Sequence, residues 1–168
     1  MSDGTGYSEE ERGVLAKAPS KIGHAVMIAS STRFFGAGRE MRAMEEALDH
    51  SCPPGESELV DGIREAARTE MKAEGWHRDL RKRRKEYHQE TLELCRKVGG
   101  ILKRDQEGEN FRRWLMNMGT KVAMAFPTDE FMGIGGVFIS RDEETLLLSI
   151  ANALGIDDYH VQRDPLSD

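Results

Sequence analysis

Two glutamates and a histidine are the residues of this 168-residue chain that could most readily bind a metal. Glu70, Glu74 and His77 are spaced by four and three residues, which places them on one face of a helix. Glu74-Gly-Trp-His77 matches the Glu-x-x-His motif of di-iron helical bundles. Such a centre needs this motif on two helices, and the sequence holds no second copy. We therefore interpret the three residues as a solvated face, with a metal site as the alternative.

A run of five cations, Arg81-Lys-Arg-Arg-Lys85, is the second feature that could bind a ligand. On a continuous helix these side chains would circle the axis, so that this turn must face solvent or a partner. Phosphates of nucleic acids, anionic lipids and acidic protein surfaces are the possible partners. The chain is acidic and has no recognised nucleic-acid motif, so we favour solvent or protein contact over nucleic acid and over a membrane surface. The candidate partner- or anion-binding residues are Arg33, Arg39, Arg78, Arg81, Lys82, Arg83, Arg84 and Lys85.

Two segments that end in Gly-x-Gly, residues 25–38 and 122–135, match without a gap. Glycine-rich turns before a helix can cradle phosphate on free backbone N–H groups, and Arg33 and Arg39 flank the first turn. A Walker lysine and a preceding strand are both missing, so we interpret the segments as structural turns, with anion binding as the alternative. The predicted turn glycines are Gly36, Gly38, Gly133, Gly135 and Gly136.

No nucleophile and base stand in a recognisable arrangement. Cys52 precedes two prolines, Cys95 falls in an apolar stripe, and Ser30 and Ser31 lack a Gly-x-Ser-x-Gly elbow. An EF-hand alignment of the second glycine segment puts Phe131, which has no ligand oxygen, at the first ligand position. We therefore predict a protein that is not an enzyme and needs no cofactor.

The elements that carry these residues are predicted to be helices. Apolar residues make up 38% of the chain, prolines number only five, and apolar positions recur at helical spacing. These features predict an all-α single domain of six or seven helices, in which helix–Gly-x-Gly–helix units form an internal pseudo-repeat. The predicted organisation is a flexible N-terminus (1–7), one helical domain (8–156) with a long charged helical insert (57–105), and an acidic tail (157–168).

Local signals predict where the helices begin and end. Capping serines are expected at Ser8, Ser57 and Ser140, and Gly155 is expected to end the last helix. Pro19 is expected to begin a second helix after a short first one. Further helices are predicted for residues 39–50 and for a long span of about 76–104. A buried stripe is predicted at Phe111, Trp114, Leu115, Met118, Val122 and Ala125.

The stretch from Gly136 to Ile156, with its Ser140/Glu143 cap and a helix ending in Leu-Gly, resembles the second half of TerB-like helical domains, named for tellurite-resistance proteins. The resemblance implies a compact cytoplasmic domain, sometimes metal-binding, in stress-linked assemblies. That family has an Asp before the turn glycine, where this chain has Phe35 and Met132. The metal-binding role therefore does not carry over.

Charge is distributed unevenly along the chain, whose net charge is −6. Residues 64–105 contain 13 basic and 8 acidic side chains, and the remainder contains 11 and 22. Parts of opposite charge attract, within one copy or between copies. Two lone cysteines suit a reducing compartment, and no signal peptide or membrane span is expected. We predict a cytoplasmic interaction or assembly protein that self-associates, with a metal- or anion-binding domain and a nucleic-acid-binding protein as alternatives.

Overall fold

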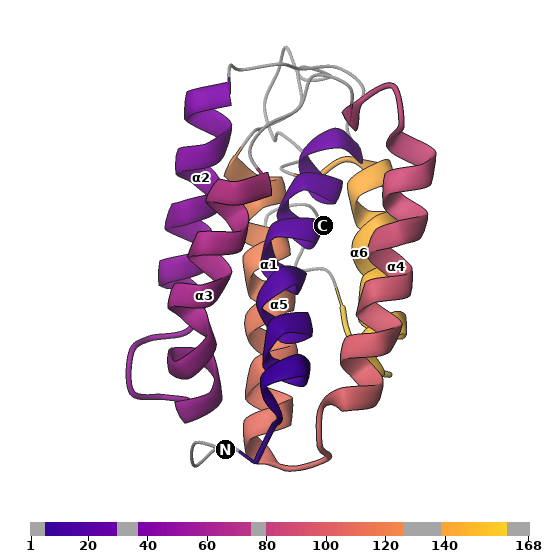
Figure 1. The fold of residues 1–168 in the computed structure, drawn as a ribbon. Helices are drawn as coiled ribbons and strands as arrows, with labels where there is room; N and C mark the ends of the chain where they lie inside the picture. The colour runs from indigo at the N-terminus through magenta and orange to yellow at the C-terminus, as the bar shows by residue number, and fades with distance from the viewer. Residues whose placement is uncertain (1–5, 30–36, 75–79, 126–138, 161–168) are drawn as a thin grey trace, which may run out of the picture.

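The computed structural model describes residues 6–29, 37–74, 80–125 and 139–160. These residues form helices and no strands, which confirms the prediction of a compact all-α fold. Successive helices run in alternating directions along the bundle (Figure 1). The helices are α1 (Glu9–Ala29), α2 (Ala37–His50), α3 (Glu58–Glu74), α4 (Arg84–Ile101), α5 (Gln106–Ala125) and α6 (Arg141–Leu154).

Helix α1 is the centre of the bundle. It lies between α3 and α4, and it packs against all five other helices (Figure 1). The predicted break at Pro19 was wrong, because Pro19 lies inside this single 21-residue helix. Buried residues flank the proline on both sides, so tertiary packing holds together a helix that the proline alone would weaken.

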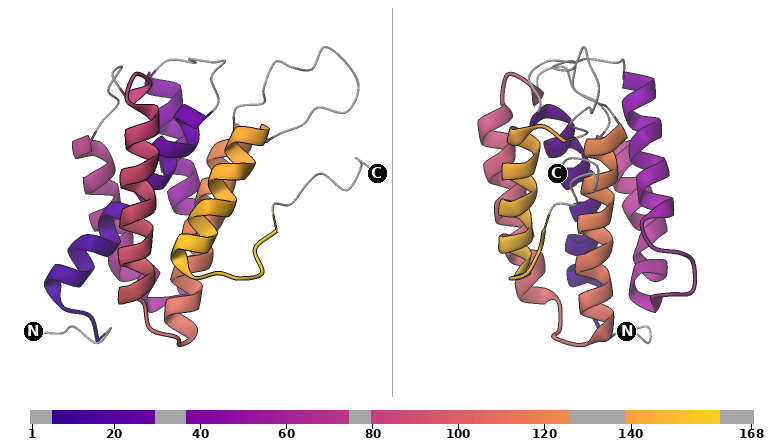
Figure 2. Two further views of the ribbon diagram at one scale, coloured as in Figure 1. Left: turned by 90° about the vertical axis from the view of Figure 1, so that its right-hand side faces the viewer. Right: turned by 180° about the vertical axis from the view of Figure 1, so that it is seen from behind.

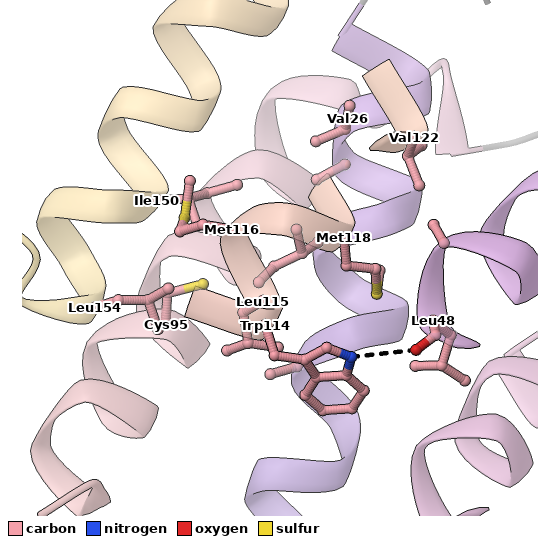
Figure 3. Close-up of a cluster of buried hydrophobic side chains, with 14 of the residues drawn as sticks. Val26, Leu48, Cys95, Trp114, Leu115, Met116, Met118, Val122, Ile150 and Leu154 are labelled. Carbon is pink, nitrogen blue, oxygen red and sulfur yellow. Dashed lines mark hydrogen bonds between the residues drawn. The ribbon is translucent and has the colours of Figure 1, made fainter. Parts of the chain in front are cut away.

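Helices α5 and α6 cover the other side of α1, as seen from behind in Figure 2. The close approach of α5 to α1 and α6 depends on Gly119. An added Cβ there would lie 3.0 Å from a methyl carbon of Leu147 and 3.1 Å from one of Ile22. Trp114 is also buried, and its indole nitrogen donates a hydrogen bond of 3.1 Å to the carbonyl of Leu48 at the end of α2 (Figure 3). The predicted stripe on α5 is buried as expected, except that Ala125 is exposed at the end of the helix.

Residues 57–105, the predicted charged helical insert, contribute α3 and α4 to the bundle. Helix α3 packs against α1 and α5, whereas α4 packs against α1 and α6. The helix predicted for residues 76–104 was too long, because α4 begins at Arg84. The N-terminus also differs from the prediction at Tyr7, which is buried and whose hydroxyl accepts a hydrogen bond of 3.1 Å from the backbone N–H of Lys103.

The predicted helix caps are confirmed. Ser8 and Glu11 bond reciprocally at the start of α1, and Ser140 forms the same capping box with Glu143 on α6. Gly155 ends α6 with a φ of 80°, in the left-handed region that favours glycine. Among the described helices, none has the length and apolar character that crossing a membrane requires.

The two predicted glycine turns fall mostly on residues 30–36 and 126–138, which lie outside the described residues. Each turn would join an antiparallel pair of helices, α1 with α2 and α5 with α6. The pseudo-repeat of the two units therefore stays a prediction.

Candidate functional site

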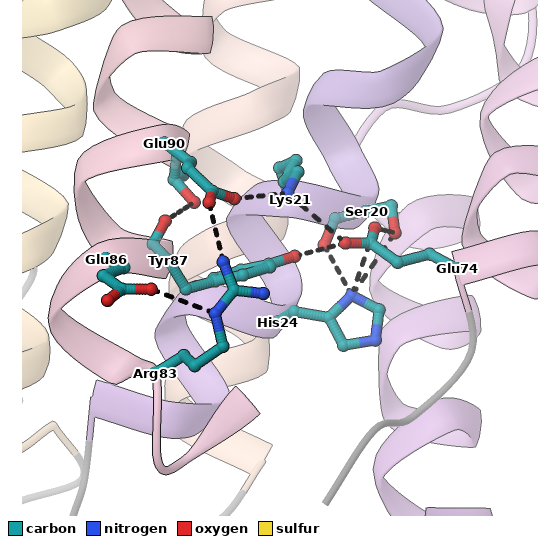
Figure 4. Close-up of polar contacts among 9 residues, drawn as sticks. Ser20, Lys21, His24, Glu74, Arg83, Glu86, Tyr87 and Glu90 are labelled. Atoms are coloured by element: carbon teal, nitrogen blue, oxygen red, sulfur yellow. Dashed lines mark hydrogen bonds and ion pairs between the residues drawn. The ribbon is translucent and has the colours of Figure 1, made fainter. Parts of the chain in front are cut away.

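Glu74, one of the predicted metal ligands, is the centre of a polar cluster that joins three helices (Figure 4). It is the last residue of α3, and its two carboxylate oxygens point to different helices. Oε2 accepts a hydrogen bond of 2.5 Å from Ser20 Oγ on α1, and Oε1 accepts one of 2.6 Å from Tyr87 Oη on α4. Lys21 Nζ lies 3.7 Å from Oε1. The cluster therefore ties the end of α3 to α1 and to α4.

His24 completes this cluster from the next turn of α1. Its Nδ1 lies 2.9 Å from the carbonyl oxygen of Ser20, 3.3 Å from Ser20 Oγ and 3.7 Å from Glu74 Oε2. Because a carbonyl oxygen can only accept, Nδ1 carries a proton and donates it toward Ser20. Nδ1 therefore cannot remove the proton of Ser20, as a general base in a nucleophilic triad would.

Three side chains of this cluster are closed to solvent, whereas the Glu74 side chain is 23% exposed. His24 is 0% exposed, Ser20 is 1% exposed and Tyr87 is 2% exposed. Burial alone would raise the pKa of Glu74, but the hydrogen bonds from Ser20 and Tyr87 and the nearby His24 and Lys21 outweigh it, so that the pKa lies below its ordinary value. Burial and the neighbouring Glu74 carboxylate raise the pKa of Tyr87. Glu74 is thus held ionised and Tyr87 neutral, as their hydrogen bond requires.

The predicted metal face is not assembled by the described residues. Glu70 is half-buried on α3 and does not take part in the Glu74 cluster, and His77 lies outside the described residues. Across residues 6–29, 37–74, 80–125 and 139–160, no three His, Cys, Asp or Glu side chains are grouped so that they could hold a metal ion. Both oxygens of Glu74 are already used in hydrogen bonds within the protein.

The basic turn, residues 81–85, differs in shape from the prediction but is open to solvent. Residues 81–83 form a turn, and only Arg84 and Lys85 belong to α4, so the cations do not circle a helix. Lys82, Arg83, Arg84 and Lys85 are exposed, whereas Arg81 is half-buried. Arg83 pairs with Glu86 at 3.0 Å and with Glu90 at 3.1 Å.

The Arg84 guanidinium lies 3.4 Å from the carbonyl oxygen of Ala29, to which it donates a hydrogen bond. Ala29 is the last residue of α1, so this contact holds the basic turn against the end of the central helix. The turn is therefore a cationic surface in a defined position, and Lys85 is exposed on it.

Of the other predicted anion-binding and turn residues, the structure describes Arg39 and Gly38. Both are exposed in the first turn of α2, and an added Cβ at Gly38 would have open space around it. Gly38 is thus helical, and no close approach of another group requires a glycine there. Arg33, Arg78, Gly36, Gly133, Gly135 and Gly136 lie outside the described residues.

A buried arginine that was not predicted from the sequence joins the ends of two helices. Arg112 on α5 is 1% exposed. Burial lowers its pKa from the ordinary value, with Glu109 acting in the opposite direction. A charged residue three positions before Leu115, on the buried side of the stripe, was the available signal. Its guanidinium donates to the carbonyl oxygens of Leu102 and Leu154 at 2.9 Å, of Lys103 at 3.1 Å and of Gly99 at 3.2 Å, and to Glu109 Oε1 at 3.0 Å.

Comparisons of the chain with protein-family models, with curated proteins and with solved structures find no match. Three features of the described residues bear on function: the Glu74 cluster, the buried Arg112 and the exposed basic turn.

Proposed function

We propose that this chain is a non-enzymatic interaction protein that self-associates through its basic turn. The observation that carries the proposal is that four consecutive cations, Lys82 to Lys85, are exposed on a chain of net charge −6. The acidic remainder of another copy offers the opposite charge. Charged surfaces of this kind steer association and select partners of opposite sign.

The buried side chains support a role without catalysis. Ser20, His24 and Glu74 are the residues whose types best suit acid–base or nucleophilic chemistry, and they bond to one another inside the bundle. A reaction needs a substrate to reach such groups, and Ser20 and His24 are almost completely covered. Their geometry supports a structural role, in which these side chains hold α3 against α1.

We further propose a cytoplasmic location and a link to stress responses. Cys52 and Cys95 are both free and buried, which suits a reducing compartment. Burial raises the pKa of both thiols, to about 12 for Cys95, so both are unreactive at neutral pH. The stress link comes only from the TerB-like pattern of residues 136–156.

Charge reversal in the basic turn tests the proposal. The variant Lys82→Glu/Lys85→Glu is compared by light scattering with the wild type and with a control, Arg96→Glu/Lys97→Glu, in about 0.1 M salt. The control changes the net charge equally, at two exposed cations elsewhere on α4. We expect the wild type and the control to be larger than a monomer and the basic-turn variant to be monomeric. A monomeric wild type that captures no partner would contradict the proposal.

Nucleic-acid binding through the same turn is the competing function. The aromatic residue nearest in sequence among those described, Tyr87, is 2% exposed and cannot stack on a base. Retention of the wild type on single or double strands at moderate salt, lost in Lys82→Glu/Lys85→Glu, would favour this alternative. Metal content and thermal shifts with divalent metals and phosphate test the metal- or anion-binding alternative.

A further inference from the structure

The basic turn and the first-turn carboxylates of three helices lie at opposite ends of the bundle. Helices α1, α3 and α5 begin at one end of the bundle, and α4, with the basic turn, begins at the opposite end (Figures 1 and 2). We propose that copies associate head to tail, so that the basic turn of one copy docks on the acidic end of the next. This inference depends on the proposed self-association and adds which surface receives the basic turn.

The acidic end is the end where α1, α3 and α5 begin, and each of these helices carries carboxylates in its first turn. Some of these are used internally: Glu107 accepts hydrogen bonds from Ser57 Oγ and the Leu59 N–H, and Asp61 pairs with Arg64. Others are exposed and make no ion pair with another described residue. These are Glu9, Glu10, Glu56 and Glu58, together with Asp157 and Asp158 beyond the end of α6. Two exposed cations, Lys103 and Arg104, lie at the same end between α4 and α5, and Arg104 pairs with Glu109 at 3.7 Å.

Helix dipoles do not cancel this negative charge. Each helix N-terminus contributes about half a positive charge, and each C-terminus about half a negative one. Because neighbouring helices are antiparallel, the starts of α1, α3 and α5 lie beside the ends of α2, α4 and α6, and the two contributions offset each other. The side chains therefore set the sign of the potential at each end.

The positions of the two surfaces determine the kind of assembly. A two-fold dimer that joins the two basic turns would place cations against cations. Pairing end to end, with both copies in the same orientation, leaves one basic turn and one acidic end free in every dimer. Such a heterologous contact continues to a third copy, and it gives a ring or a filament according to the rotation between copies.

Neutralised variants that each retain one surface test the inference. The first, Lys82→Gln/Arg84→Gln/Lys85→Gln, retains only the acidic end, and the second, Glu9→Gln/Glu10→Gln/Glu58→Gln, retains only the basic turn. All six residues are exposed, and circular dichroism checks that both variants are folded. We expect each variant alone to be monomeric by light scattering at low salt. An equimolar mixture should double in mass and grow no further, because the resulting heterodimer has no complementary surfaces left.

The outcomes separate this inference from the proposed function. Assembly of the wild type that stops at a dimer, or a Glu9/Glu10/Glu58 variant that assembles like the wild type, would overturn the head-to-tail arrangement and leave self-association intact. A mixture in which both variants stay monomeric, although the wild type assembles, would overturn it as well. A wild type that is monomeric at low salt would refute both. Binding of the retained basic turn to duplex DNA in place of the partner variant would assign the turn to nucleic acid.

Discussion

Replacing Arg112 by methionine should destabilise the bundle more than any substitution on the surface, because this one side chain donates hydrogen bonds to the ends of two helices. Its guanidinium bonds to three carbonyls at the end of α4 and to the carbonyl of Leu154 at the end of α6. A hydrogen bond to a charged group contributes about 1.5–3 kcal/mol, and such bonds on one group are not additive. Methionine would leave these four carbonyls without their donor, and a buried acceptor left unsatisfied costs about 1–3 kcal/mol. Allowing for non-additivity, we expect the free energy of unfolding to fall by about 3–5 kcal/mol.

Thermal and urea unfolding measure this loss. For a domain of this length each kcal/mol lowers Tm by about 2–4 °C, so that Arg112→Met should lower Tm by about 6–20 °C. Arg113→Met is the matched control, since Arg113 is the exposed neighbour on the same helix. Arg112→Lys should lose most of the same stabilisation, because an ammonium group cannot reproduce the planar hydrogen-bonding geometry of the guanidinium. If Arg112→Met costs no more than Arg113→Met, the role assigned to the buried guanidinium is refuted.

Two further predictions concern the α4–α6 contact and the Glu74 cluster. Gly99→Ala should destabilise by about 1–3 kcal/mol in urea unfolding, because its Cβ would lie 2.9 Å from the carbonyl oxygen of Ala153. Gly100→Ala, with open space around the new Cβ, should stabilise by about 0.5–1 kcal/mol; equal effects at the two glycines would contradict the close packing. Glu74→Gln should cost about 1–3 kcal/mol at pH 7, through lost hydrogen bonds to a charged group. Because the pKa of Glu74 is lowered from 4.5 in the folded state, the wild-type advantage is complete above pH 4.5 and shrinks as the pH falls through the folded pKa. A difference between wild type and Glu74→Gln that stays constant from pH 7 to about pH 3 would show that the carboxylate charge does not stabilise the cluster.

Local patterns predicted much of the fold. Ser8, Ser57 and Ser140 each cap a helix, because capping depends on residues only two or three positions apart. The apolar stripe of α5 was predictable because a helix buries residues at a fixed period. Features that depend on short sequence separations can be read without knowing how the chain folds.

The remaining features depend on contacts between distant segments. Pro19 signals a helix start locally, but packing on both sides keeps it inside α1. Ser20 and Glu74 are 54 positions apart, so that no sequence pattern joins them. The basic turn was expected to be helical, since neither glycine nor proline interrupts residues 81–85, yet α4 begins only at Arg84. A charged residue on a buried stripe, such as Arg112, is a signal that can be used in other sequences.

Sedimentation velocity measures whether copies of this chain bind one another through opposite charges, as we propose. The full chain is examined over a concentration series at about 0.01 M and about 1 M salt, between which the screening length falls from about 30 Å to about 3 Å. We expect species larger than a dimer that grow with concentration at low salt, and a single monomer boundary at high salt. A monomer at both salt concentrations, or an oligomer that salt does not dissociate, would contradict it.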